Sequence, residues 1–184
     1  MKNPIEQPWI EAGYQLFSKE GPDALKVDRI ARMVGISRSS FYHLFADLDV
    51  FQEKLLAHHA QRAQQAAEKV KQCNTMNPDY IWTIIEEKDY VLFNRQLRIY
   101  RDNAAYKAGF ENAITLVGKE TMGIWTEMVG LQHKPEMART FFKMTADILF
   151  HRMTEENMNF EWLQSFMNEM KLFVKDATGG NQPK

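Results

Sequence analysis

The sequence predicts an all-α protein with a small three-helix N-terminal domain followed by a larger helical domain. Apolar residues recur at helical spacing along nearly all of its 184 residues, and no stretch shows the period-2 alternation of a half-buried strand. Only six prolines and nine glycines interrupt this pattern. The composition also shifts near residue 75, because nearly all of the methionines and three of the four tryptophans lie beyond it.

About nine helices are expected. The first ends at Gly21-Pro22 and the fourth at the segment 74–78, because glycine, proline and asparagine favour turns. The domains are expected at 1–47 (helix-turn-helix), 48–178 (ligand binding and dimerisation) and 179–184 (a disordered tail). The expected helices span about residues 6–20, 27–34, 38–45, 48–73, 78–87, 89–102, 104–130, 135–155 and 160–176.

Composition excludes several classes of protein. The 45% hydrophobic and 26% charged residues are typical of an ordinary soluble domain. No apolar run approaches the roughly 18–20 residues of a membrane span, and the N-terminus lacks the apolar core of a signal peptide. We therefore expect a cytoplasmic protein with no membrane partner. The single cysteine, Cys73, argues against an internal disulfide and against a cysteine-rich metal site.

The net charge of −1 hides a local excess of positive charge. Residues 26–45 hold four cations, Lys26, Arg29, Arg32 and Arg38, against the single anion Asp28, and four minus one leaves +3. Attraction to phosphate depends on where charge is placed, so a basic patch in a neutral protein is informative about nucleic acid.

The segment 27–45 has the pattern of two short helices joined by a tight turn. Gly35 permits the left-handed conformation that ends the first helix. Ile36 is expected to be a buried plug in the turn, and Ser37 is expected to cap the second helix. On that second helix the apolar Phe41, Leu44 and Phe45 fall on one face, and the polar Arg38, Ser39, Tyr42 and His43 fall on the other.

One face of this second helix can pack while the other stays cationic and rich in donors, as a reader of the major groove requires. The alternative is a plain corner between two helices. The pattern is longer than a corner, however. Over about residues 9–56 the chain resembles the N-terminal domain of TetR-family transcriptional regulators, in the segments "WIEAGYQLFSKEG", "VDRIARMVGISRSSFYHLF" and "DVFQEKLL".

The resemblance implies a homodimer whose third helix enters the major groove of double-stranded DNA at a near-palindromic operator. Arg38 would bind a guanine or a phosphate, and the short Ser39 and Ser40 would allow close approach. Tyr42 would reach a phosphate oxygen, and His43 a base edge or the backbone. The predicted DNA-binding residues are Lys26, Ser37, Arg38, Ser39, Ser40, Tyr42 and His43.

Three positions depart from the family pattern. Lys26 stands where a capping threonine or serine is common, Leu44 where histidine or tyrosine is frequent, and Leu48 where a phosphate-binding lysine is frequent. Asp47 and Asp49 beside Leu48 would repel phosphate and instead favour the N-terminus of the fourth helix. These departures predict weaker binding to DNA or a smaller dependence on salt.

The resemblance also implies that the larger domain binds a small inducer of unknown identity. Aromatic and methionine side chains can form the walls of such a pocket, although a stripe of this kind is more often plain core. His151 lies one helical turn from Asp147 and could form a pocket dyad or a surface pair. The candidate ligand-binding residues are Trp82, Phe93, Tyr100, Tyr106, Phe110, Trp125, Met144 and His151.

The last two helices are strongly amphipathic. In similar proteins these helices pair with their symmetry mates into a four-helix bundle. The alternative is that their apolar stripes only close the core of the monomer. The candidate dimer-interface residues are Phe141, Ile148, Leu149, Trp162, Phe166 and Phe173.

A ligand-released repressor is therefore the predicted function. One alternative is a regulator of the same fold that responds to a protein partner or to no ligand, and a remote alternative is an all-helical enzyme. No phosphate-binding loop, nucleophile elbow or carboxylate pair stands out. His58 and His59 are adjacent on a helix and point about 100° apart. We expect no catalytic residue, no metal site and no cofactor.

Overall fold

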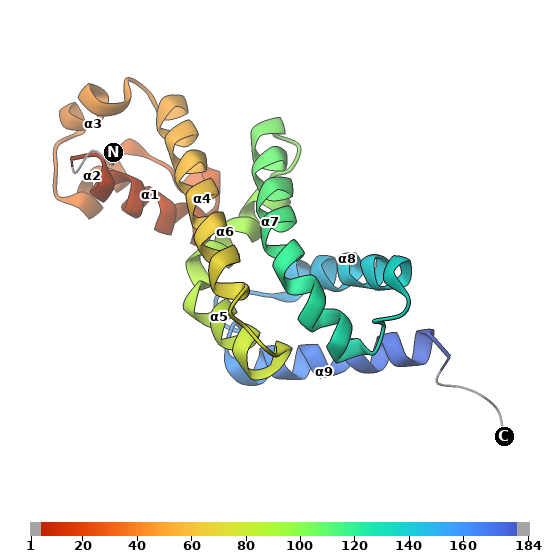
Figure 1. Cartoon of the computed structure of the whole chain (residues 1–184). Coiled ribbons are helices and arrows are strands. Elements are labelled where there is room, and N and C mark those ends of the chain that lie inside the picture. The colour runs from red at the N-terminus through yellow and green to blue at the C-terminus, as the bar shows by residue number, and fades with distance from the viewer. Residues whose placement is uncertain (1–4, 180–184) are drawn as a thin grey trace. The chain divides into compact units, whose positions relative to one another are not determined.

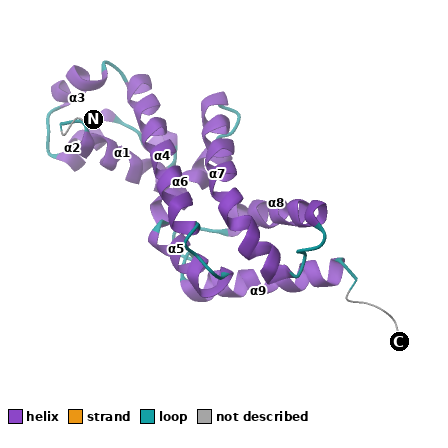
Figure 2. Cartoon of the chain, viewed as in Figure 1, coloured by secondary structure: helices purple, strands orange, loops and turns teal. Residues whose placement is uncertain are grey.

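The computed structural model describes residues 5–179, in which all regular structure is helical and no strand occurs (Figures 1 and 2). The all-α prediction is confirmed. None of the described helices is both long and apolar enough to cross a membrane. The helices are α1 (Gln7–Glu20), α2 (Val27–Val34), α3 (Arg38–Phe45), α4 (Leu48–Val70), α5 (Ile81–Glu86), α6 (Lys88–Ile99), α7 (Ala104–Val129), α8 (Pro135–Arg152) and α9 (Phe160–Ala177), with a 3-10 turn at Pro22–Ala24 and a π-helical turn at Met76–Tyr80.

Three helices, α4, α6 and α8, each end three residues earlier than the sequence pattern predicts. α4 stops at Val70 because the next turn tightens: the Cys73 N–H donates to the Val70 carbonyl, three residues back, at 2.9 Å. α8 stops at Arg152 because the Asn157 side chain closes a turn. Its amide Oδ1 accepts from the Thr154 N–H at 2.7 Å, and its Nδ2 donates to the Arg152 carbonyl at 2.9 Å.

The chain divides into two compact units whose boundaries fall inside α4, after the first residue of α6 and inside α7. Unit 1 comprises the residues through Gln65 together with Asp89–Ile114, and unit 2 comprises Ala66–Lys88 and the residues from Thr115 onward. The described part of the helix-turn-helix segment, through residue 47, thus packs as one body with most of α4, nearly all of α6 and the start of α7. A functional boundary at residue 47 stays a prediction. Of the expected tail, Gly179 lies in a turn and 180–184 lie outside the described residues.

The helix-turn-helix is held together by a cluster of buried aromatic rings in unit 1. The ring of Trp9 on α1 meets that of Phe41 on α3 edge-on at 5.6 Å, and Phe41 and Phe45 lie 5.3 and 5.0 Å from Phe51 on α4. α1 approaches this cluster closely at Gly13, where a Cβ atom would lie 2.4 Å from the Phe51 ring. Aromatic packing therefore fixes α3 against both α1 and α4.

Unit 2 has its own core, to which α7, α8 and α9 contribute. Trp125 on α7 is 1% exposed and meets Phe142 on α8 edge-on at 5.5 Å. α9 begins at Asn159, whose side chain accepts a hydrogen bond from the Trp162 N–H at 2.9 Å and so caps the helix. The buried residues of α9 recur every three or four positions, as expected for an amphipathic helix: Leu163, Phe166, Met167, Met170 and Val174.

Candidate nucleic-acid interface

The two faces of α3 differ as the sequence predicts. Phe41 and Phe45 are buried, whereas Tyr42 between them is 47% exposed. The apolar face therefore fixes the helix, and the polar face is left open to solvent. Among the predicted DNA-binding residues, Ser40 is half-buried and Lys26, Ser37, Arg38, Ser39, Tyr42 and His43 are exposed.

The turn between α2 and α3 forms through the backbone. Gly35 adopts the predicted left-handed conformation (φ 74°), and the N–H groups of Gly35 and Ile36 both donate to the Ala31 carbonyl, at 2.9 and 3.2 Å. Because the backbone closes the turn, no buried side chain is needed, and Ile36 is 38% exposed. The expectation of a buried plug is wrong. Ser37 does occupy the N-cap, but its hydroxyl pairs with that of Ser40 at 3.1 Å instead of with the backbone.

The family departures at the helix starts have local explanations. Lys26 occupies the N-cap of α2 without a side-chain capping bond, and it is exposed. Leu48 packs against the core of unit 1. Asp47 caps α4, because its Oδ1 accepts from the Val50 N–H at 2.9 Å. At the N-terminus of α4, Leu48 and Asp47 thus serve packing and capping.

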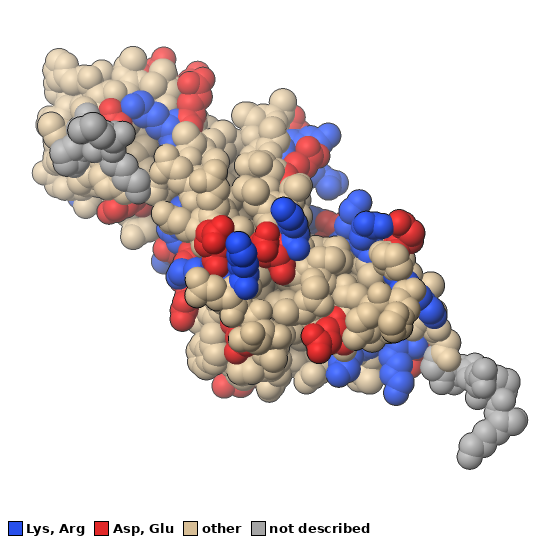
Figure 3. Space-filling view, viewed as in Figure 1, with Lys and Arg blue, Asp and Glu red and all other residues tan. Residues whose placement is uncertain are grey.

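Two of the four cations in the basic patch form ion pairs. Arg29 on α2 makes two hydrogen bonds to the carboxylate of Glu20, which raise the pKa of Arg29 and lower that of Glu20. The Nε atom of Arg38 lies 3.0 Å from Oδ1 of Asp28. On the face seen in Figure 3, cationic and anionic side chains are interspersed instead of forming a block of one sign. The positive electrostatic field around residues 26–45 is therefore weaker than the number of cations there indicates.

A buried polar network joins α1, α4 and α6 inside unit 1. His59 of α4 is 1% exposed; its Nδ1 lies 2.8 Å from the Tyr14 hydroxyl, and its Nε2 lies 3.2 Å from Oδ1 of Asn94. Since an amide oxygen only accepts, Nε2 carries the proton and Nδ1 accepts from Tyr14. Burial lowers the pKa of His59 from 6.5 to about 3, so the imidazole is neutral.

Two further bonds connect α6 to α1. The Ser18 hydroxyl donates to the Asp89 carbonyl at 2.9 Å, and Nε2 of Gln96 donates to the Lys19 carbonyl at 3.2 Å. None of these contacts is predicted from the sequence. The available signal was a pair of amides, Asn94 and Gln96, inside the apolar segment 90–100, where a polar side chain needs a partner.

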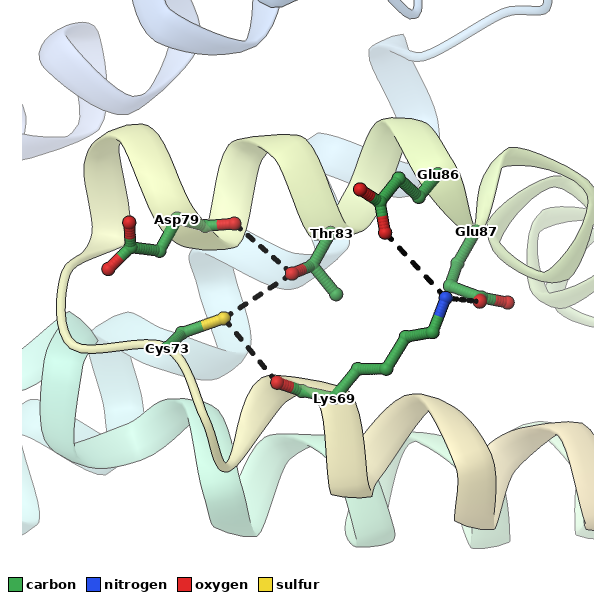
Figure 4. A network of polar contacts seen from close by, with 6 residues as sticks. All are labelled: Lys69, Cys73, Asp79, Thr83, Glu86 and Glu87. Carbon is green, nitrogen blue, oxygen red and sulfur yellow. Dashed lines mark hydrogen bonds and ion pairs between the residues drawn. The ribbon is translucent and has the colours of Figure 1, made fainter.

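The C-terminal end of α4 is tied to α5 within unit 2 (Figure 4). Nζ of Lys69 lies 2.6 Å from Oε1 of Glu87 and 3.6 Å from Oε2 of Glu86. The hydrogen bond that Lys69 donates to Glu87 is the largest cause that raises the pKa of Lys69. Beside it, Sγ of Cys73 lies 3.3 Å from the Thr83 hydroxyl. α4 is therefore anchored by side chains in both units.

The candidate ligand-binding residues in unit 1 form part of its core or bond to neighbours. Phe93 is fully buried between the rings of Tyr14 and Phe17, at 4.4 and 4.1 Å. The Tyr106 hydroxyl donates to the side chain of Gln52. Tyr100 and Phe110, also in unit 1, are half-buried against the same core.

The other candidate ligand-binding residues lie in unit 2. Trp82 is 52% exposed and its ring lies 4.8 Å from that of Phe160. Trp125 is buried, whereas Met144 and His151 are exposed. The structure thus divides the candidates between two units, and a role in ligand binding stays a prediction for all of them. Among residues 5–179, no three His, Cys, Asp or Glu side chains are grouped so that they could hold a metal ion.

The candidate dimer-interface residues differ in exposure. Leu149 and Phe166 are buried within the chain itself, and Phe141, Ile148 and Trp162 are half-buried. Phe173 is 42% exposed, and its ring meets that of Phe141 edge-on at 5.9 Å. The adjacent Leu172 is 60% exposed. α9 therefore presents apolar side chains outside the core of the monomer.

Residues 10–48 match the family described as "Bacterial regulatory proteins, tetR family". They cover most of α1, all of α2 and α3, and the first residue of α4. This segment is a TetR-family N-terminal domain. The resemblance predicted from "IARMVGISRSSFYHLF" is confirmed, and the family implies a DNA-binding transcriptional regulator.

Over most of its length the chain is similar in fold to a solved structure of a putative TetR-family transcriptional regulator from Mesorhizobium loti MAFF303099. The two share 13% sequence identity with a TM-score of 0.58, and the match covers 94% of this chain and 96% of the other. At this identity the likeness shows the fold alone. The comparison with curated proteins gives no match.

Proposed function

We propose that this TetR-family protein is a cytoplasmic, non-enzymatic repressor that binds a near-palindromic operator as a homodimer and is released by a small molecule. The observation that carries the proposal is the exposed polar face of α3, held on a buried aromatic cluster. Arg38, Tyr42 and His43 supply charged or polar groups on that face, and a rigid helix of this kind fits the major groove. Ser39 adds little bulk, so the helix backbone can approach the bases.

Dimerisation is supported by the exposed apolar side chains of α9. Leu172 and Phe173 lose contact with water if α9 meets its own copy, and a two-fold interface of this kind brings the same patch from both subunits together. A two-fold dimer would place its two α3 helices about 34–36 Å apart, one turn of B-DNA, which explains a palindromic site.

A ligand bound in the larger domain would act through α4 and α6. α4 is bonded at His59 in unit 1 and at Lys69 in unit 2, and α6 bonds directly to α1 through Gln96. A movement of either helix would therefore be transmitted to the helix-turn-helix that contains α3. A ligand releases DNA only to the extent that it binds the released state more tightly. The alternative is a regulator that responds to a protein partner or to no ligand.

The experiment is a selection from random duplex DNA with the purified protein at near-physiological salt, followed by sequencing. We expect an enriched near-palindrome with half-sites about one helical turn apart. If the protein is a folded dimer and enriches no sequence, the proposal that the ligand-free protein binds an operator is contradicted. The selected duplex then serves to screen small molecules for release, and loss of DNA binding with a named molecule separates the ligand-released repressor from its alternative.

A further inference from the structure

We propose that Asp28 holds Arg38 in position to read a guanine, so that Asp28 is a positioning residue for base recognition although its own charge opposes DNA. The inference rests on the proposed function, since it requires α3 to lie in the major groove. It decides between two roles, guanine or phosphate, that the sequence leaves open for Arg38.

The two residues face each other across the helix-turn-helix. Asp28 lies in the first turn of α2, Arg38 is the first residue of α3, and both line an open hollow between the two helices. Oδ1 of Asp28 is 3.0 Å from Nε of Arg38. A hydrogen bond with Tyr42, one helical turn further along α3, and the charge of Asp28 both raise the pKa of Arg38.

The atom that Asp28 contacts decides what Arg38 can do next. A guanidinium has one edge formed by its two terminal Nη groups and another that includes Nε. Asp28 contacts the guanidinium at Nε and Tyr42 hydrogen-bonds to it as well, so only the neutral Tyr42 hydroxyl has to give way before the terminal edge meets the two acceptors O6 and N7 of a guanine. Holding the planar fork before DNA arrives reduces the entropy lost on binding.

Arg29 provides the contrast within the same domain. Glu20 engages both of its terminal groups: Nη1 donates to Oε2 at 2.7 Å and Nη2 donates to Oε1. The edge that would read a guanine is therefore bound to a carboxylate in Arg29, whereas in Arg38 the carboxylate contact is at Nε and the second partner is the neutral Tyr42 hydroxyl. Of these two paired arginines, Arg38 is the one set up for base recognition.

Electrostatics favours a base over a phosphate at Arg38. The carboxylate of Asp28 cancels most of the charge of the guanidinium at a distance, and it repels a phosphate that approaches either group. Guanine O6 and N7 are neutral acceptors, so they keep the directional hydrogen bonds without that repulsion. The Asp28–Arg38 pair is therefore attracted less to the DNA backbone than a free arginine, but it keeps the hydrogen bonds that discriminate between bases.

The test uses the selected operator duplex with single guanines replaced by 7-deazaguanine, which lacks N7, or by inosine, which keeps N7 and O6. We expect one guanine per half-site whose 7-deaza replacement weakens wild-type binding about tenfold, the size of one lost base contact, while inosine does not. Arg38→Ala abolishes that penalty, and Asp28→Asn reduces it to about threefold or less. Glu20→Gln removes the same charge beside Arg29 and keeps the penalty near tenfold.

The salt dependence of binding supplies the second readout. If Arg38 reads a base, Arg38→Ala lowers affinity but leaves the slope of log K against log salt unchanged; a slope smaller by about 0.9 assigns Arg38 to a phosphate and overturns the inference. Arg38→Lys, which keeps the charge without the planar fork, should show a smaller 7-deaza penalty and keep the slope. Unfolding midpoints of all variants confirm that each is folded.

The outcomes separate this inference from the proposed function. If Arg38→Ala weakens binding but Asp28→Asn retains the full tenfold penalty, Asp28 does not position Arg38 and the inference fails alone. If neither Arg38→Ala nor Tyr42→Ala changes binding to the selected duplex, α3 is not the reader, and both fail.

Discussion

The imidazole of His59 makes the stability of the protein depend on pH within a defined window. His59 is 1% exposed, bonded to Tyr14 and Asn94, and burial lowers its pKa from 6.5 to about 3. Between these two values the unfolded chain binds a proton at His59 and the native protein does not. The stabilisation that the neutral His59 imidazole gives the native protein is therefore complete above about pH 6.5 and is lost progressively as the pH falls toward 3.

The size of the effect follows from the two pKa values. At pH 5 the imidazole of the unfolded chain is almost fully protonated, whereas that of the native protein is neutral. The free energy lost relative to pH 7.5 is RT ln(1 + 10^1.5), about 2 kcal/mol. That is a large share of the ~5–15 kcal/mol by which domains are usually stable.

The assay is chemical denaturation at pH 7.5 and pH 5.0 at one fixed protein concentration. We expect His59→Leu to lose about 2 kcal/mol less than the wild type between the two pH values, because it has no imidazole to titrate. Tyr14→Phe is the matched control: it weakens the same network but retains the imidazole, so it should keep most of the wild-type pH dependence. An identical pH dependence in His59→Leu and wild type refutes the reasoning.

Three further substitutions test the packing and the helix ends by thermal or chemical unfolding. Gly13→Ala places a Cβ atom 2.4 Å from the Phe51 ring and should destabilise the protein by about 1–3 kcal/mol; a neutral result means that α1 and α4 pack less closely than described. Ala46→Gly relieves a non-glycine residue at φ 58° and should stabilise by about 1 kcal/mol, whereas a loss of stability contradicts the left-handed backbone there. Asn159→Ala removes the cap of α9 and should lower the free energy of unfolding by about 1 kcal/mol. An unchanged unfolding midpoint would show that the hydrogen bond from the Trp162 N–H does not stabilise the protein.

The helices and the reader face could be predicted from the sequence because local patterns determine them. Apolar spacing places Phe41 and Phe45 on one side of α3, and only a glycine suits the left-handed end of α2 at Gly35. Hydrogen-bond partners are harder to predict from the sequence where a side chain has several possible partners nearby. Ser37 occupies the expected cap position, yet its hydroxyl pairs with Ser40.

Contacts between distant segments could not be predicted from spacing. Asn94 and Gln96 reach α1 and α4 across gaps of 35 residues or more, and no local pattern names their partners. The same limit applies to Asp28, whose sequence context shows only an anion within the basic patch. Its contact with Arg38 depends on how the turn at Gly35 folds α3 back toward α2.

The central claim is that the exposed face of α3 reads DNA, and the affinity of Tyr42→Ala for the selected operator duplex tests it most directly. Tyr42 is 47% exposed and packs edge-on against Phe41 at 5.5 Å, so its removal leaves the buried face of α3 in place. The account predicts that fluorescence anisotropy at near-physiological salt shows binding weaker by about 1 kcal/mol or more, with selected and unrelated duplexes affected alike, because the contact is to phosphate. The control variant His133→Ala, at an exposed residue in unit 2, should bind as the wild type does. A folded Tyr42→Ala protein with wild-type affinity, together with an equally unaffected Arg38→Ala, would contradict the claim.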